Sequence, residues 1–114
     1  MNNTVSMRYN SDFRRLYNKG NSVAAGFLVI YYKRKNCDKN VLGITVSKKI
    51  GKAVKRNRVR RLIKECYRLR ENEIKAGYHI VFVARSRAVG ATFEQMRRDI
   101  GYLLNKSGLL EPKS

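Results

Sequence analysis

The chain of 114 residues carries 26 lysine and arginine residues against 8 aspartate and glutamate residues, a formal net charge of +18. This length predicts a single domain spanning residues 1–114, with frayed ends before about residue 10 and after about residue 108. With 43% hydrophobic residues the chain can bury a core, which excludes a disordered basic tail. The excess of positive charge indicates a polyanionic partner, and nucleic acid is the first to consider.

Neither a signal peptide nor a membrane span is predicted. The N-terminal segment MNNTVSMRYN has no apolar stretch, and the longest apolar run, FLVIYY at 27–32, is too short to cross a bilayer. A cytoplasmic protein with no membrane partner is therefore expected. Cys37 and Cys66 have no metal-ligand neighbour at CxxC or HxxxH spacing, so both are predicted to be reduced thiols.

The first expected element is a short amphipathic helix. Ser11 can cap its start, and Gly20 supplies a stop signal. Between them, Phe13, Leu16 and Tyr17 fall at i, i+3 and i+4. The helix should therefore present one face that carries two aromatic side chains.

Two strand-like runs follow this helix. Residues 23–34 are rich in β-branched and aromatic residues and apolar on both faces, although Gly26 can mark a bulge or a shift of register. Residues 35–40 (KNCDKN) have the composition of a turn. Residues 41–47 then alternate apolar side chains with small or polar ones, which is typical of a strand. The two runs are predicted to form a hairpin.

Two further helices and another strand complete the pattern. A helical apolar stripe runs over residues 59–67, and YHIVFVAR at 78–85 predicts a strand. Thr92 and Gln95 have capping-box spacing at the start of the last helix, and Gly108 ends it. The fold class is therefore α+β, a two-layer domain in which a mixed sheet of about four strands packs against three helices in the order αβ(β)βαβα.

The middle helix carries an unusual charge. From residue 48 to residue 70 there are 11 basic residues and one acid, Glu65, although like charges at i, i+4 destabilise a helix. An external partner should compensate, and arginine favours phosphate because its planar fork makes bidentate contacts. At 100° per residue, the side chains opposite the apolar stripe are Asn57, Arg61, Lys64 and Arg68. The edges of the stripe and the preceding loop add Arg58, Arg60, Lys48, Lys49 and Lys52.

RNA is favoured over DNA as the partner, and no DNA partner is expected. Aromatic side chains can stack on unpaired bases, and Phe13, Tyr17 and Tyr31 lie on elements near the basic helix. Ordinary core packing is the competing interpretation for these three residues. The chain is therefore predicted to be a single RNA-binding domain.

No catalytic residue is assigned in the chain. The eight carboxylates are scattered, and the one histidine, His79, lies in a strand pattern among apolar residues. Metal-dependent nucleases normally converge several carboxylates on divalent ions, and no such cluster or phosphate-cradling glycine loop is evident. Any catalysis is expected to reside in a partner.

The run IGKAVKRNRVRRLIK at 50–64 resembles the signature of the bacterial ribonuclease P protein component, including its core of Arg56, Asn57 and Arg58. The resemblance extends to SDFRRLYNKGNSV at 11–23, GITVSKKIG at 43–51 and VARSRA at 83–88. It covers roughly residues 9 to 108. A structural RNA-binding protein, such as a ribosomal protein, stays open as an alternative because size, charge and fold would suit it equally. A protein-only nuclease is a third possibility.

The resemblance implies an accessory subunit that binds a catalytic RNA and the 5′ leader of precursor tRNA, and assists the endonucleolytic removal of that leader. It implies that the RNA performs the hydrolysis and that Mg²⁺ acts with the RNA. It also implies a ribosomal-protein-like fold with a βαβ crossover around the basic helix. The implied contacts to the RNA subunit are Lys48, Lys49, Lys52, Arg56, Asn57, Arg58, Arg60, Arg61, Lys64 and Arg68, and the implied leader contacts are Phe13, Tyr17 and Tyr31.

Overall fold

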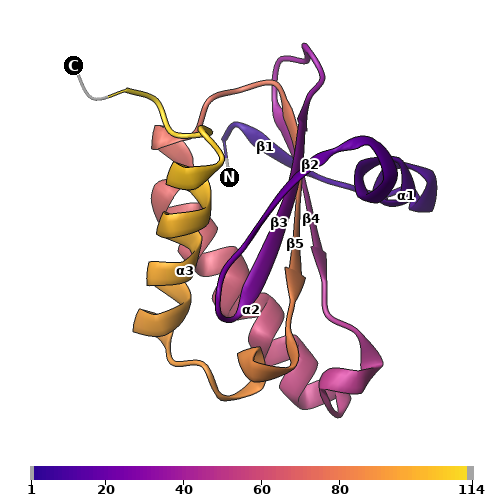
Figure 1. The fold of residues 1–114 in the computed structure, drawn as a ribbon, viewed down its shortest axis with the longest axis vertical. Helices are drawn as coiled ribbons and strands as arrows, with labels where there is room; N and C mark the ends of the chain where they lie inside the picture. Colours follow the sequence, from indigo (N-terminus) through magenta and orange to yellow (C-terminus); the bar gives the residue numbers. More distant parts are fainter. Residues whose placement is uncertain (1, 113–114) are drawn as a thin grey trace.

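The computed structural model describes residues 2–112 and contains one five-stranded sheet with three helices (Figure 1). The strands are β1 (Thr4–Ser6), β2 (Asn21–Ala24), β3 (Leu28–Arg34), β4 (Asn40–Thr45) and β5 (Tyr78–Ala84). The helices are α1 (Asn10–Lys19), α2 (Ala53–Arg70) and α3 (Phe93–Lys106). Three single turns of 3₁₀ helix are η1 (Lys48–Ile50), η2 (Glu71–Glu73) and η3 (Ser86–Gly90). The predicted α+β class is confirmed, and the predicted element order holds from α1 onward. Strand β1 was not predicted and brings the sheet to five strands instead of about four.

The sheet has the strand order β1-β4-β5-β3-β2. Strand β5 is antiparallel to β3 and parallel to β4, and β1 is parallel to β4. The expected βαβ crossover around the basic helix is present as β4-α2-β5. The hairpin predicted between residues 23–34 and 41–47 is wrong, because β5 lies between β3 and β4. Strand β5 is buried on both faces over Ile80, Val81 and Phe82, so the centre of the sheet suits it.

The run 23–34 forms two strands of an antiparallel hairpin instead of one strand. Strands β2 and β3 pair from Asn21 opposite Tyr32 to Ala24 opposite Val29. Exposed Gly26 lies in the connecting turn, which Asp99 fastens by accepting a 2.6 Å hydrogen bond from the backbone N–H of Phe27. The possible bulge at this glycine is therefore a chain reversal.

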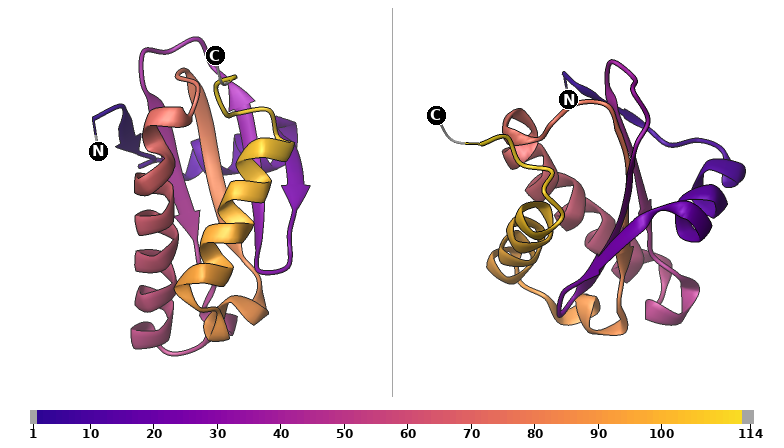
Figure 2. Two further views of the ribbon diagram at one scale, coloured as in Figure 1. Left: turned by 90° about the vertical axis from the view of Figure 1, so that its left-hand side faces the viewer. Right: turned by 45° about the horizontal axis from the view of Figure 1, so that its top comes forward.

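Helices cover both faces of the sheet (Figures 1 and 2). Helices α2 and α3 pack on one face over the main core, and the predicted apolar stripe of α2 points into it. Helix α1 packs on the opposite face, where buried Leu16 contacts Val81 and Met7. The fold therefore adds a partial third layer to the two layers expected. The fully buried side chains of the α2 stripe are Val59, Ile63, Cys66 and Tyr67, and Leu62 is half-buried.

Residues 4–6 and 109–110 make tertiary contacts within the segments where frayed ends were expected. Strand β1 pairs with β4 from Thr4 opposite Asn40, and the Thr4 hydroxyl lies 3.0 Å from the Tyr67 hydroxyl. At the other end, Leu109 is buried and Leu110 forms a bridge to Ile74. These segments are short, so their order depends on tertiary contacts that leave no periodic signal in the sequence.

The helix ends agree with the sequence in one case and differ in another. The predicted capping box of α3 is confirmed, because Gln95 N–H donates to Thr92 Oγ1 at 3.1 Å and Thr92 N–H donates to Gln95 Oε1 at 2.9 Å. The predicted Ser11 cap is wrong, because α1 begins at Asn10 and its N-cap is Tyr9, two residues before Ser11, without a side-chain bond. Within residues 2–112, no helix combines the length and the apolar character that crossing a bilayer requires.

Gly20→Ala is expected to destabilise the fold by about 1–3 kcal/mol through overpacking. An added Cβ would lie 2.6 Å from the Leu16 carbonyl oxygen and 3.2 Å from the Tyr32 carbonyl oxygen, and neither backbone group can move aside easily. Urea denaturation measures the loss. Gly26→Ala is the matched control, because nothing lies within 4 Å of an added Cβ there, and its stability should change by less than about 0.5 kcal/mol.

Candidate nucleic-acid interface

Helix α2 exposes the face that the helical angles predict. Asn57, Arg61, Lys64 and Arg68 are all exposed, and we call them the basic face. The side chains of Arg61 and Lys64 make no hydrogen bond or ion pair with residues 2–112. Arg68 is bound to Glu65, with Nη2 2.6 Å from Oε1 and Nε 3.0 Å from Oε2. This pairing lowers the pKa of Glu65, so the one acid on α2 neutralises Arg68 and leaves Arg61 and Lys64 charged and unpaired.

The arginines on either side of Asn57 hold neighbouring loops. Arg58 donates from Nη2 to the Ala91 carbonyl oxygen at 3.1 Å, and more weakly from Nη1 to that of Val89 at 3.4 Å. Half-buried Arg56 donates from Nε to the Gly51 carbonyl oxygen at 3.1 Å. Each guanidinium keeps further N–H donors, because arginine has five. Both side chains therefore position the loops at the start of α2 while retaining charge for a partner.

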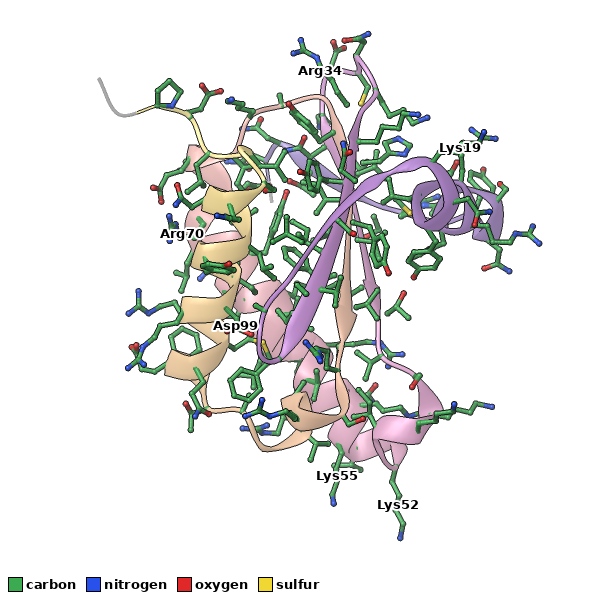
Figure 3. All side chains as sticks on the ribbon, in the orientation of Figure 1. Lys19, Arg34, Lys52, Lys55, Arg70 and Asp99 are labelled. Atoms are coloured by element: carbon green, nitrogen blue, oxygen red, sulfur yellow. The ribbon has the colours of Figure 1, made fainter. Side chains whose placement is uncertain are left out.

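Three lysines extend the positive charge beyond α2. Lys48 and Lys49 lie in η1, and Lys52 is the N-cap residue of α2; all three side chains are exposed. Figure 3 shows Lys52 and Lys55 reaching from the lower end of the molecule into solvent. The N-terminus of a helix also carries partial positive charge from its free N–H groups. This end of the protein therefore concentrates positive charge that no acid in residues 48–64 offsets.

The three predicted aromatic residues lie together on the α1 side of the sheet. The ring centroids of Tyr17 and Tyr31 are 5.0 Å apart at 73°, and those of Phe13 and Tyr17 are 6.5 Å apart. Tyr17 is 37% exposed, and the other two are half-buried. A 2.8 Å hydrogen bond joins the Tyr17 hydroxyl to Thr45 Oγ1. These rings, which we call the aromatic cluster, are accessible from solvent and are not sealed in the main core.

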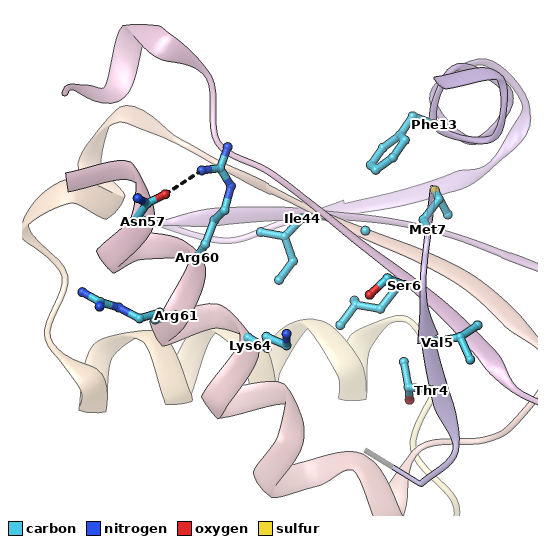
Figure 4. A pocket seen from close by; sticks show the side chains of 12 residues that line it. Thr4, Val5, Ser6, Met7, Phe13, Ile44, Asn57, Arg60, Arg61 and Lys64 are labelled. Carbon is cyan, nitrogen blue, oxygen red and sulfur yellow. Dashed lines mark hydrogen bonds between the residues drawn. The ribbon is translucent and has the colours of Figure 1, made fainter. Parts of the chain in front are cut away.

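A hollow of about 430 Å³ opens beside the aromatic cluster, and a larger one of about 600 Å³ lies between β1, β4 and α2 (Figure 4). Phe13 lines both, so the two hollows meet at this residue. At the larger hollow, Arg60 donates to Asn57 Oδ1 at 3.2 Å within α2 and, more weakly, to the Val46 carbonyl oxygen after β4 at 3.5 Å. Unpaired bases could enter next to the rings, with phosphates near α2.

Several lining residues were not identified from the sequence. Thr4, Ser6 and Met7 form one wall of the larger hollow, and they belong to the segment that was expected to be frayed. Gly43 lies directly under the Phe13 ring, and Thr45 bonds to Tyr17. The alternating pattern of residues 41–47 did place Gly43 and Thr45 on the same face of a strand, and this was the one feature of the sequence that could have indicated them. The pairing of that face with α1 was not visible in the pattern.

Burial shifts the pKa values of two further side chains that could act chemically, Cys66 and His79. Burial, followed by the nearby Glu65 charge, raises the pKa of the Cys66 thiol to about 11. Burial also lowers the pKa of His79, which lies near Asp12. Within residues 2–112, no three His, Cys, Asp or Glu side chains are grouped so that they could hold a metal ion.

Comparisons with known proteins agree with this geometry. The family model described as Ribonuclease P matches residues 1–108. The ribonuclease P protein component of Clostridioides difficile (strain 630) is 48% identical over 109 residues, covering 95% of this chain and 96% of that protein. That of Alkaliphilus oremlandii (strain OhILAs) is 44% identical over 104 residues, covering 91% of each.

Solved structures extend the similarity to the fold. The RNase P protein of Staphylococcus aureus matches with a TM-score of 0.85 and 34% identity, covering 93% of this chain and 97% of that one. The RNase P protein of Thermotoga maritima matches with a TM-score of 0.81 and 27% identity, covering 90% and 96%. The ribosomal-protein alternative finds no support among these relatives. The match over nearly the whole length, together with the Arg56-Asn57-Arg58 core on an exposed basic helix, shows that this chain belongs to the ribonuclease P protein component family.

Proposed function

We propose that this protein subunit of ribonuclease P binds the catalytic RNA through α2 and binds the 5′ leader of precursor tRNA through the aromatic cluster. The observation that carries the proposal is the positive charge of η1 and α2, where the one acid of residues 48–70 is paired with Arg68, beside solvent-accessible rings. Positive groups of this kind bind phosphates and release counterions. Aromatic side chains stack on unpaired bases without requiring one sequence.

The two surfaces suit different parts of an RNA complex. Lys48, Lys49 and Lys52 project from one end of the molecule and can approach the phosphates of a folded RNA from outside. Phe13 and Tyr17 of the aromatic cluster line a hollow bounded by α1 and β4, which suits an unpaired strand better than a duplex. The protein would therefore join a structured RNA on one side to a single-stranded leader on the other.

In this proposal, hydrolysis of the phosphodiester bond belongs to the RNA subunit, and the Mg²⁺ that it requires acts there. The residues of this chain bind and orient: basic side chains fix the RNA backbone, and the aromatic cluster favours substrates that carry a leader over mature tRNA. Endonucleolytic formation of the mature 5′ end would then occur in the cytoplasm, where precursor tRNA is made.

Recovery of the bound RNA tests the proposal. The protein is purified from its host under low salt, and the RNA that copurifies is sequenced. One structured RNA together with tRNA precursors is expected. Ribosomal RNA as the main bound species would contradict the proposal and would indicate a structural RNA-binding protein.

A further inference from the structure

The aromatic cluster is one end of a longer groove. The hollow of about 600 Å³ shares Phe13 with the hollow beside the cluster, and it shares Thr4, Ser6, Arg61 and Lys64 with a third hollow of about 530 Å³ along α2. We call these two hollows, bounded by β1, the edge of β4 and α2, the edge groove. A strand leaving the aromatic cluster past Phe13 would enter the edge groove directly.

The floor of the edge groove is an unpaired stretch of sheet edge. Pairing of β1 with β4 ends at Ser6 opposite Leu42, and Met7 N–H makes a last 2.8 Å hydrogen bond to the Leu42 carbonyl oxygen. Backbone groups alternate sides along a strand, so the N–H and C=O of Ile44 point to the same edge as those of Leu42. Ile44 lines the hollow just where β1 has ended. The floor thus offers a donor and an acceptor to a polar occupant.

The walls of the edge groove carry charge of one sign. Arg60, Arg61 and Lys64 line the α2 side, and no acid is among the residues of 2–112 that line the 600 Å³ hollow. The opposite wall presents the hydroxyl of Ser6 and that of Thr4, which also lies 3.0 Å from the Tyr67 hydroxyl (Figure 4). Glu65 enters only in the third hollow, where Arg68 pairs with it. A polyanion with hydrogen-bonding groups complements these walls, and an RNA strand has both.

We propose that the single-stranded leader continues beyond the aromatic cluster into the edge groove, with its phosphates on Arg61 and Lys64. The family resemblance implied that Arg61 and Lys64 contact the catalytic RNA. In this inference they bind the leader instead, and the lysines of η1 and the start of α2 remain for the catalytic RNA. The leader is the favoured occupant because the groove is continuous with the aromatic cluster through Phe13. This inference rests on the proposed function, which places the leader at that cluster.

A nested series of leaders tests the inference. Precursor tRNAs with leaders shortened one nucleotide at a time are bound to the complex of the protein and its catalytic RNA. Arg61→Ala/Lys64→Ala should weaken binding of long-leader precursors about tenfold, because two charge-assisted contacts are lost. Mature tRNA and leaders that reach only the aromatic cluster should keep wild-type affinity. The salt slope for long-leader precursors should fall by about 1.4, because each single-strand phosphate contact contributes about 0.7.

The matched control is Arg98→Ala/Lys106→Ala, which removes the same charge from exposed positions on α3 and should leave the leader-length dependence unchanged. If Arg61→Ala/Lys64→Ala weakens the binding of every substrate and of the catalytic RNA equally, these residues contact the catalytic RNA. That result would overturn the inference and leave the proposed function intact. If the dependence of affinity on leader length is unchanged in Arg61→Ala/Lys64→Ala and also in Phe13→Ala, both the inference and the proposed leader site are wrong.

Discussion

Phe13→Ala and Gly43→Ala are both expected to weaken leader binding, although residue 43 has no side chain to contact RNA. An added Cβ would lie 2.5 Å from Phe13 Cε1, 2.7 Å from Phe13 Cζ and 3.1 Å from Val81 Cγ2. Val81 is buried and Phe13 is half-buried, so the Phe13 ring should be displaced. One lost stack weakens binding of leader-bearing precursor by about 1–3 kcal/mol. Competition between precursor and mature tRNA for the assembled complex measures the effect.

A double variant separates displacement of the ring from general damage. Gly43→Ala alone should also reduce stability by about 1–3 kcal/mol, because the crowded ring strains the packing. In Phe13→Ala/Gly43→Ala the crowding against the Phe13 ring is gone and only the 3.1 Å approach to Val81 Cγ2 remains, so stability should return close to that of Phe13→Ala while leader binding stays lost. The two substitutions should thus be non-additive, as expected for side chains in contact. Wild-type stability and leader affinity in Gly43→Ala would show that the ring is not fixed over residue 43.

Replacing Lys48, Lys49 and Lys52 together by glutamine is expected to flatten the salt dependence of binding to the catalytic RNA. Each lost phosphate contact lowers the slope of log affinity against log salt by about 0.7–0.9, so three contacts lower it by about 2–3. With about six phosphates neutralised, the wild-type affinity should fall about 10³-fold between low and moderate salt. The side chain of Lys52 makes no capping bond to α2, so the fold should tolerate the change.

The control is a second triple variant with the same loss of charge elsewhere. Lys39, Arg98 and Lys106 are exposed and lie outside η1 and α2, so their replacement by glutamine should change the slope little. Filter binding across a salt series gives both slopes. Equal flattening by the two triple variants would mean that the RNA responds only to net charge, and that the lysines near α2 form no defined contact surface.

The sequence was most informative where structure depends on neighbours along the chain. The buried stripe and exposed basic face of α2 follow from residue angles within one helix, and the capping box of α3 depends on two residues three positions apart. The strand-like runs at 23–34 and 78–85 likewise indicated β structure without tertiary information. These parts of the fold were predictable because hydrophobic periodicity is a local property.

Features that depend on strand order were not predictable in this way. The position of β5 between β3 and β4 is set by long-range pairing, so the expected hairpin was wrong. Strand β1 has three residues, TVS, and no periodic signal, so the wall that it gives the edge groove was missed. The gathering of Phe13, Tyr17 and Tyr31 was expected only from the family resemblance. The place of Gly43 beneath Phe13 required the packing of α1 on the sheet.

The central claim is that this protein assists leader removal by a catalytic RNA, and reconstitution tests it most directly. The protein is added to its catalytic RNA, and cleavage of a leader-bearing precursor tRNA is followed across a Mg²⁺ series, with RNA alone and protein alone in parallel. The protein should lower the Mg²⁺ concentration that the RNA needs for leader removal, and the protein alone should cleave nothing. An unchanged Mg²⁺ requirement, or cleavage by the RNA-free protein, would contradict the claim.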